Sequence, residues 1–240
     1  MEYNKLYNYN MQGNVIDFPA TFAKVMRNVY GWMSCGLLMT ALTAMIVAGH
    51  PDIIYAIATN KLLLWGLFGA GIGLVLWLSA RINSMSSMTA GLMFAAYAIL
   101  NGVTMSFIFL TYTMESIAST FFTTAGTFAV MSFIGFVTKK DLSGIGKILT
   151  MLLIGLVIAT IVNIFVANSG LSLILNYVGV FVFVGLTAYD TQKIKTLVHE
   201  ATMYGDEEQT NKLALMGSLT LYLDFINLFL YLLRFLGNRK

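Results

Sequence analysis

Charged residues are scarce in this chain of 240 residues. Asp, Glu, Lys and Arg together make up 10% of the sequence, whereas hydrophobic residues make up 58%. Soluble domains carry about 25% charged residues, so a soluble domain of this size could not cover its surface with so few. The scarcity excludes an ordinary soluble protein and favours a chain that lies within a lipid bilayer.

Cysteine and proline are nearly absent as well. The single cysteine, Cys35, excludes a disulfide or a multi-cysteine metal site within one chain. The two prolines, Pro19 and Pro51, lie outside the long hydrophobic runs and leave those runs free to form unbroken helices. The basic residues form no stripe interleaved with aromatic residues, so we expect no nucleic-acid partner.

Seven hydrophobic runs are long enough to cross a bilayer, because a spanning helix needs about 20 apolar residues. They are Tyr30–Ala48, Leu62–Ala80, Met88–Leu110, Ile117–Val137, Ile148–Ala167, Leu171–Tyr189 and Leu215–Leu236. Backbone groups in lipid must bond within their own segment, so we predict an all-α integral membrane protein with seven transmembrane helices. We expect a polar N-terminal segment over residues 1–24 and a single transmembrane domain over residues 25–240.

The basic residues divide unevenly between the two sides that seven spans define. Ten of the 14 share the side of the N-terminus: Lys5, Lys24, Arg27, Arg81, Lys139, Lys140, Lys147, Lys193, Lys195 and Lys212. Because cytoplasmic loops carry the excess of Lys and Arg, we predict a cytoplasmic N-terminus. With no organelle address in the sequence, we expect the bacterial inner membrane. A six-span alternative, in which the last run is re-entrant, would bring the basic C-terminal tail back to the cytoplasm.

The last run carries a single polar stripe. Its members recur every three or four residues, which is the spacing of one helix face: Gly217, Thr220, Asp224, Asn227, Tyr231 and Arg234. A helix that is apolar on its other faces suits the centre of a helix bundle. The stripe is either a polar path or a hydrogen-bonded seam that joins helices.

Two aspartates lie where an acidic group is costly. Asp224 is near the middle of the last run, and Asp190 follows the sixth run, inside the helix if it continues through Ile194. An ionisable group at bilayer depth costs roughly 2.5–3.5 kcal/mol and usually has a function. We select both as candidate site residues, with Thr187 on the face of Asp190. Arg81, at the end of the second run, is a candidate counter-ion.

Plainer interpretations remain open for some of these residues. Asp190 could pair with a nearby lysine at the interface, and Arg81 could extend its side chain to the membrane surface. We expect Asn101, inside the third run, to form a hydrogen bond between helices. Gly69 and Gly73 form a GxxxG pattern, which predicts close helix packing.

The stretch Gly185–Lys195, which reads GLTAYDTQKIK, resembles the signature of the Bax inhibitor-1 family, also called the transmembrane Bax inhibitor motif family. The segment 221–229 resembles the final helix of that family, and the resemblance extends from about Val25 to Leu236. It implies seven helices, six of them in two three-helix layers around a central C-terminal helix.

The resemblance also implies an activity, a pH-sensitive leak of Ca²⁺ through the membrane. In that family the two matching aspartates form a sensing pair, and an arginine of the second helix, here Arg81, is a partner. Two carboxylates close together in low dielectric cannot both ionise cheaply. A proton shared by Asp190 and Asp224 would therefore join the last two helices, and its loss would push them apart.

Calcium is expected as the permeating ion, without a tightly bound cofactor. Ca²⁺ takes six to eight oxygen ligands, and the sequence holds no EF-hand loop. We therefore expect Asp190 and Asp224 to bind it only weakly and transiently.

Three other functions compete with the leak. The protein could be a non-conducting regulator that binds a membrane protease or another membrane protein, or a proton-coupled transporter. An intramembrane aspartyl protease would need a Gly-x-Gly-Asp motif, which precedes neither Asp190 nor Asp224. We therefore expect no enzymatic activity. Measurement of ion flux with purified protein in liposomes would separate the leak from the regulator.

Overall fold

The computed structural model describes residues 18–204 and 207–240, and seven of the helices within them are long and apolar enough to cross a bilayer. These helices are α2 (Phe18–Ala48), α4 (Lys61–Arg81), α5 (Ser87–Met105), α7 (Met114–Val137), α8 (Ser143–Val166), α9 (Ser169–Tyr204) and α10 (Glu207–Leu236). Three short helices lie between them: α3 (Pro51–Thr59), η1 (Ile82–Ser84) and α6 (Ile108–Thr111). The predicted all-α fold with seven spans is confirmed.

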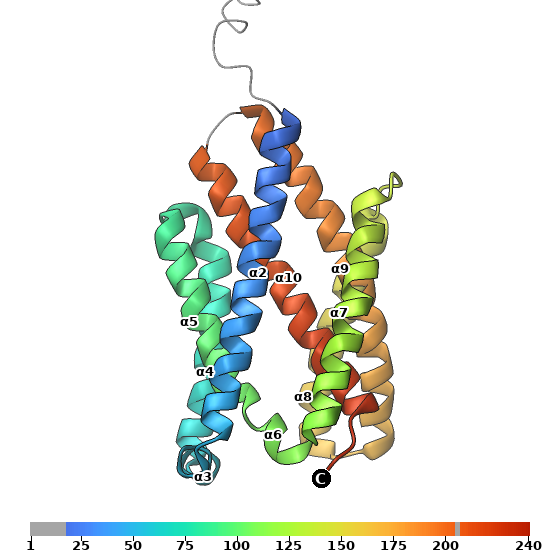
Figure 1. The fold of residues 1–240 in the computed structure, drawn as a ribbon. Coiled ribbons are helices and arrows are strands. Elements are labelled where there is room, and N and C mark those ends of the chain that lie inside the picture. Colours follow the sequence, from blue (N-terminus) through green and yellow to red (C-terminus); the bar gives the residue numbers. More distant parts are fainter. Residues whose placement is uncertain (1–17, 205–206) are drawn as a thin grey trace, which may run out of the picture.

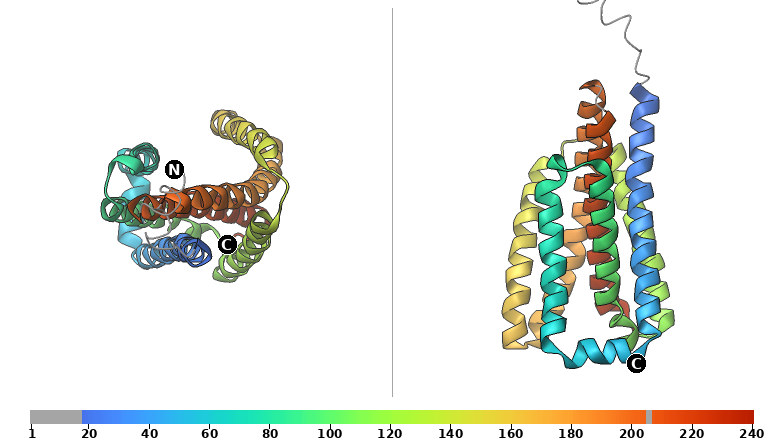
Figure 2. Two further views of the ribbon diagram at one scale, coloured as in Figure 1. Left: turned by 90° about the horizontal axis from the view of Figure 1, so that it is seen from above. Right: turned by 90° about the vertical axis from the view of Figure 1, so that its left-hand side faces the viewer.

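Helix α10 passes obliquely between two layers of helices (Figures 1 and 2). One layer holds α2, α4 and α5, and the other holds α7, α8 and α9. Helix α10 packs most extensively on α9 and also contacts α2, α5 and α7. Its side chains Leu221, Tyr222 and Leu228 are fully buried. The central position predicted for the last helix is confirmed.

Polar side chains cap the N-terminal ends of several spanning helices. The Asn60 side chain accepts hydrogen bonds from two backbone N–H groups at the start of α4. Ser86 and Thr113 each accept one at the starts of α5 and α7. These bonds satisfy N–H groups that the first turn of a helix leaves without a partner. The polar residues between the hydrophobic runs therefore set where the helices start.

The last helix crosses the whole bundle, so the re-entrant alternative is wrong. The C-terminus lies at the opposite end from the start of α2 (Figure 1). There the C-terminal tail is hydrogen-bonded to the segment between α6 and α7. The Thr113 N–H donates to the Asn238 carbonyl over 3.2 Å, and the Lys240 N–H donates to the Thr111 carbonyl over 3.0 Å.

Two helices extend well beyond the hydrophobic runs that predicted them. Helix α2 begins at Phe18, within the polar segment expected over residues 1–24; residues 1–17 of that segment lie outside the described residues. Helix α9 continues past Tyr189 to Tyr204 and takes up much of the connector between the sixth and seventh runs. Asp190 therefore lies inside a helix.

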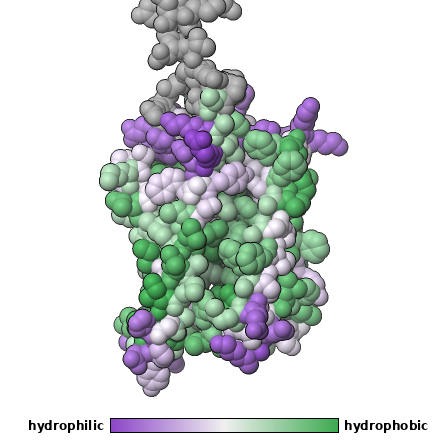
Figure 3. Space-filling model, viewed as in Figure 1, coloured by the Kyte–Doolittle hydropathy of each residue, from purple (hydrophilic) through white to green (hydrophobic). Residues whose placement is uncertain are grey.

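The outer helices present apolar side chains to the surroundings of the bundle. Hydrophobic residues cover the middle of the molecule and hydrophilic residues gather toward its two ends (Figure 3). Large exposed side chains on α4 and α8 include Leu62, Trp65, Leu76, Ile158 and Phe165. A surface of this kind belongs in hydrocarbon rather than water. The chain is an integral membrane protein.

The close packing predicted for Gly69 and Gly73 is wrong. A β-carbon added at either position would meet nothing within 4 Å in the described part of the chain. The tight contacts lie elsewhere: Gly102 of α5 packs against Thr40 and Thr43 of α2, where a β-carbon would approach to 2.6 Å. The GxxxG spacing alone does not reveal which face of a helix is covered.

Candidate functional site

Asp190 on α9 and Asp224 on α10 face each other, and their carboxyl groups interact where the two helices pack together. Asp224 is only 4% exposed, and Asp190 is half-buried. An ionised carboxylate has no donor, so a bond between two carboxyl groups requires a proton. The structure thus brings the two aspartates together across the contact between α9 and α10.

Asp224 Oδ2 is buried and has no N–H or hydroxyl group as a hydrogen-bond partner within residues 18–204 and 207–240. A buried acceptor without a donor costs free energy, typically about 1–3 kcal/mol. A proton on one of the two carboxyl groups would supply a donor at this position.

Four consecutive residues of the α9 signature contact four different parts of the bundle. Successive residues of an α-helix point about 100° apart, so four of them face every direction around it. The Tyr189 ring packs on Gly146 of α8, and Asp190 meets α10. Thr191 reaches α7, and Gln192 reaches the segment between α7 and α8. The signature makes α9 the helix through which α7, α8 and α10 are held together.

The Gln192 side chain fixes the turn between α7 and α8. Its Nε2 donates to the carbonyls of Thr138 and Lys140 over 3.2 and 2.9 Å. Its Oε1 accepts a hydrogen bond of 2.8 Å from the Leu142 N–H. Nearby, Lys195 Nζ donates to the Phe136 carbonyl in the last turn of α7 over 2.7 Å. Two residues of the signature therefore position the end of α7.

A chain of hydroxyl groups joins α2, α7 and α9. The Thr191 hydroxyl donates to the Thr187 carbonyl over 2.7 Å, so it can only accept from Ser132, 3.0 Å away. Ser132 in turn accepts from the Tyr30 hydroxyl over 2.5 Å. This chain starts at Thr191, next to Asp190, and ends on α2. Sequence reasoning did not find it, because hydroxyl residues are common in membrane helices and carry no distinctive spacing here.

The polar stripe of α10 faces α9. Gly217 lies against the Ile194 side chain, and the Tyr231 ring packs on Gly179 and stacks with Phe183 at 5.8 Å. In this arrangement the stripe is a packed seam between α9 and α10. Arg234, at the end of the stripe, is exposed and lines a pocket with residues of α4 and α5.

The smaller polar groups of the site bond to their own helices. Thr220 donates to the Met216 carbonyl over 3.0 Å, and Asn227 donates to the Leu223 carbonyl over 2.8 Å. The buried Thr187 donates to the Phe183 carbonyl over 2.7 Å. The two aspartates, in contrast, interact across the seam.

Arg81 does not meet the aspartates. Its side chain is exposed at the end of α4, and the cation that acts on Asp190 is Lys193, about one turn further along α9. Arg81 ends an outer helix, from which a long side chain extends outward more easily than into the bundle. Its position supports the plainer interpretation of a residue at the membrane surface.

A second polar cluster lies on the opposite face of α10. The Thr40 hydroxyl donates to the Ala98 carbonyl over 2.9 Å, so it accepts from the Tyr222 hydroxyl, 2.7 Å away. Asn101 donates to Tyr222 over 3.0 Å, which confirms the predicted bond between helices. Tyr222 was not singled out because it reads as one of many aromatic residues in its run. Polar contacts thus hold α10 to both layers.

Comparisons with known proteins agree with this architecture. A model of the family described as "Inhibitor of apoptosis-promoting Bax1" matches residues 22–240. The chain belongs to the Bax inhibitor-1 family. The match extends over nearly the whole chain, so the α9 signature and the central α10 are features of a Bax inhibitor-1 protein rather than a local similarity.

Relatives in this family span most of the chain. Inner membrane protein YbhL of Escherichia coli (strain K12) is 48% identical over 227 residues, covering 95% of this chain and 97% of its own length. An uncharacterized protein of Borreliella burgdorferi is 44% identical and covers 90% of this chain and 93% of its own length. An uncharacterized protein of Rickettsia prowazekii, RP147, is 40% identical and covers 93% of both.

Proposed function

We propose that this Bax inhibitor-1 protein is a pH-sensitive Ca²⁺ leak in which α10 is the gate. The observation that supports the proposal is the contact between the carboxyl groups of Asp190 and Asp224, across which a shared proton would join the central helix to α9. Loss of that proton sets two like charges against each other in a low-dielectric site. The repulsion separates α10 from α9 along their seam and opens a polar path, so flux rises with pH.

The donor set supports passage rather than storage of Ca²⁺. Two carboxyl groups supply fewer oxygens than the six to eight that Ca²⁺ takes. An ion that meets Asp190 and Asp224 keeps part of its water shell and leaves readily. We propose Ca²⁺ as cargo, with no tightly bound cofactor and no enzymatic step.

We also propose the bacterial inner membrane as the location, with the N-terminus in the cytoplasm. A relative with 48% identity is named an inner membrane protein. The excess of basic residues on the N-terminal side supports this orientation.

The test is Ca²⁺ flux into liposomes at a series of pH values for the wild type, Asp190→Asn and Asp224→Asn. An amide can hydrogen-bond to the remaining carboxyl group at every pH, so both variants should stay closed and lose the rise of flux with pH. Glu115→Gln, an exposed acidic residue in the first turn of α7, is the matched control and should keep the wild-type profile. Unchanged profiles in both aspartate variants would refute the proposal.

The second candidate is a non-conducting regulator that binds another membrane protein, such as a membrane protease. One observation favours it: Gly217 and Tyr231 of the α10 stripe are packed against α9. The same flux assay separates the two. Flux that stays at the level of protein-free liposomes at every pH supports the regulator.

A further inference from the structure

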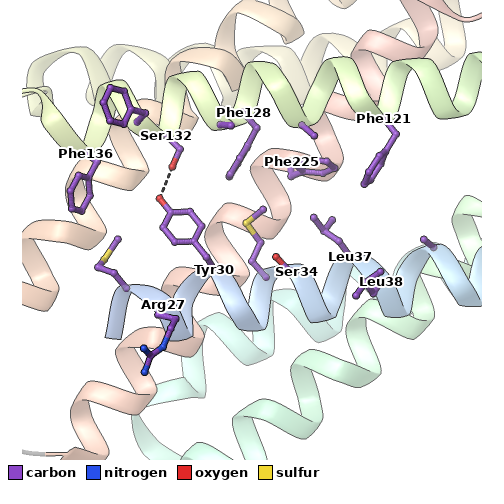
Figure 4. A pocket seen from close by; sticks show the side chains of 16 residues that line it. Arg27, Tyr30, Ser34, Leu37, Leu38, Phe121, Phe128, Ser132, Phe136 and Phe225 are labelled. Carbon is purple, nitrogen blue, oxygen red and sulfur yellow. Dashed lines mark hydrogen bonds between the residues drawn. The ribbon is translucent and has the colours of Figure 1, made fainter. Parts of the chain in front are cut away.

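An apolar groove runs along the bundle between α2 and α7. These helices both pack on α10 but hardly on each other, and they leave a cavity of about 810 Å³. Figure 3 shows it as a hollow among hydrophobic residues, and Figure 4 shows Phe121 and Phe128 of α7 on one side and Leu37 of α2 on the other. Phe225 of α10 closes its inner side. A cavity of this size falls in the range of ligand-binding sites.

The groove has the length and surroundings of a lipid tail. Along α7 it extends from Phe136 to Phe121, about 22 Å at 1.5 Å per residue. One leaflet of a bilayer is about 15 Å of hydrocarbon thick. Leu38 and Phe133 at the groove are 64% and 66% exposed, so it opens toward the lipid. Water would find few hydrogen-bond partners in a groove lined by apolar side chains. An acyl chain can fill the groove without losing polar contacts.

Basic and polar groups lie at one end of the groove. Phe136 lines the groove with its ring, and Lys195 Nζ lies 5.3 Å from the centre of that ring. A neighbouring cavity of about 420 Å³ is lined by Phe22, Lys195, Thr196 and His199. The Phe22 and Phe136 rings, 6.2 Å apart, lie between the two cavities. Arg27 is exposed on α2 at the same end.

We propose that the groove between α2 and α7 binds one acyl chain of an anionic phospholipid, whose phosphate is held by Lys195 and Arg27. Lys195 uses one of its three N–H donors on the Phe136 carbonyl and keeps two for a phosphate. The end that holds these cations is the end rich in Lys and Arg, where anionic lipids bind most strongly. The bound chain packs against Phe225, next to Asp224, and supports α10 where α2 and α7 leave it uncovered.

This inference does not depend on the Ca²⁺ leak, because its readout is lipid retention rather than flux. The full chain is placed in nanodiscs that contain equal amounts of phosphatidylglycerol and phosphatidylcholine. Lipids that stay bound after release into detergent are counted by native mass spectrometry. The wild type should retain one phosphatidylglycerol in preference to phosphatidylcholine.

Two groups of variants test the tail and the head of the lipid separately. Ala129→Trp and Ala125→Trp fill the groove and should abolish retention, whereas Ile158→Trp, on the lipid-facing surface of α8, should not. Arg27→Gln and Lys195→Gln should each weaken the preference for phosphatidylglycerol about fivefold, the value of one cation near an anionic headgroup. Lys139→Gln removes an exposed charge at the same end and should leave the preference unchanged.

Thermal unfolding identifies which variants are folded, and Ala129→Trp at the exposed edge of the groove provides a test if Ala125→Trp does not fold. Equal retention of both lipids by the wild type would overturn the proposal. Retention that survives in folded groove-filling variants would do the same. A mass of two chains that disappears in Ala129→Trp would assign the groove to a second copy of the protein instead.

Discussion

Gly135 of α7 lies directly against the backbone carbonyl of Ala188 on α9, in a contact that leaves no room for a β-carbon. This contact is close to Asp190, and it lets the two backbones approach as far as the hydroxyl chain and the Gln192 bonds require. Small residues serve this purpose in membrane proteins, where helices gain most from close packing.

Gly135→Ala should therefore destabilise the protein by about 1–3 kcal/mol, the usual cost of forcing an extra carbon into a packed interior. The measurement is thermal unfolding in detergent, where the midpoint should fall. Gly126→Ala on the same helix is the control, because a β-carbon there meets nothing within 4 Å. The control should match or exceed the wild type, since alanine favours helix more than glycine does. Equal effects of the two substitutions would contradict the packing argument.

Gln192→Leu should loosen the turn between α7 and α8. The substitution removes three hydrogen bonds and leaves the Thr138 and Lys140 carbonyls and the Leu142 N–H without their partner. Hydrogen exchange at Leu142 should become faster, measured by mass spectrometry. Gln192→Glu keeps the acceptor for the Leu142 N–H and loses the two donors. Its exchange rate at Leu142 should therefore lie between those of the wild type and the leucine variant. Exchange at wild-type rates in the leucine variant would show that the side chain does not hold the turn.

Tyr222→Phe should lower the free energy of unfolding by about 0.6–1.7 kcal/mol, the range from the mean to the largest values measured for polar contacts between membrane helices. The substitution removes the hydroxyl that joins α10 to Thr40 and Asn101. Tyr177→Phe is a suitable control, because Tyr177 is 46% exposed and packs its ring on Phe235. Unfolding in denaturant should separate the two variants, and a control that is as unstable as Tyr222→Phe would argue against the cluster.

The start of α8 should respond to acid through Asp141. Its carboxylate accepts hydrogen bonds from the Ser143 side chain and backbone, the latter over 2.8 Å, and these bonds, with a smaller effect of Lys147, hold the pKa of Asp141 below its ordinary value. A pKa that is lower in the folded state means that the group stabilises at pH above its ordinary pKa. That contribution is lost as pH falls through the folded pKa.

The expected result is faster hydrogen exchange in the first turn of α8 when the pH falls below the titration range of Asp141. Asp141→Asn keeps a side-chain acceptor that does not titrate, so it should remove this pH dependence. The exchange rates need correction for the intrinsic effect of pH, with a peptide from the middle of α8 as the internal reference. A pH response that persists in the asparagine variant would assign it to another group.

The helices and the aspartates could be predicted because both are local features of the sequence. A run of about 20 apolar residues defines a span by itself, and a carboxyl group inside such a run stands out. The centre of the bundle was predictable from the stripe around Asp224. The extension of α9 to Tyr204 was harder to predict, because its last turns are polar and no hydrophobic run marks them.

The partners in most contacts between helices could not be predicted from the sequence. The position of Gly146 under the Tyr189 ring and the reach of Gln192 to the α7–α8 turn depend on the register between helices, which no spacing within one helix determines. For the same reason Gly69 and Gly73 suggested a packed face where the structure has an open one. Arg81 was predicted as a counter-ion to the aspartates, but it ends an outer helix and its side chain is exposed.

The hydrogen bonds between the C-terminal tail and the segment before α7 anchor the C-terminal end of α10. Residues Tyr112 and Arg239 pair there as neighbouring extended segments. A tilt about this point displaces each residue in proportion to its distance from it. Asp224 lies about 18 Å along the helix from Leu236, and Glu207 about 44 Å, at 1.5 Å per residue. If the two carboxyl groups part as proposed, a small displacement of Asp224 would thus move the far end of the helix more than twice as far.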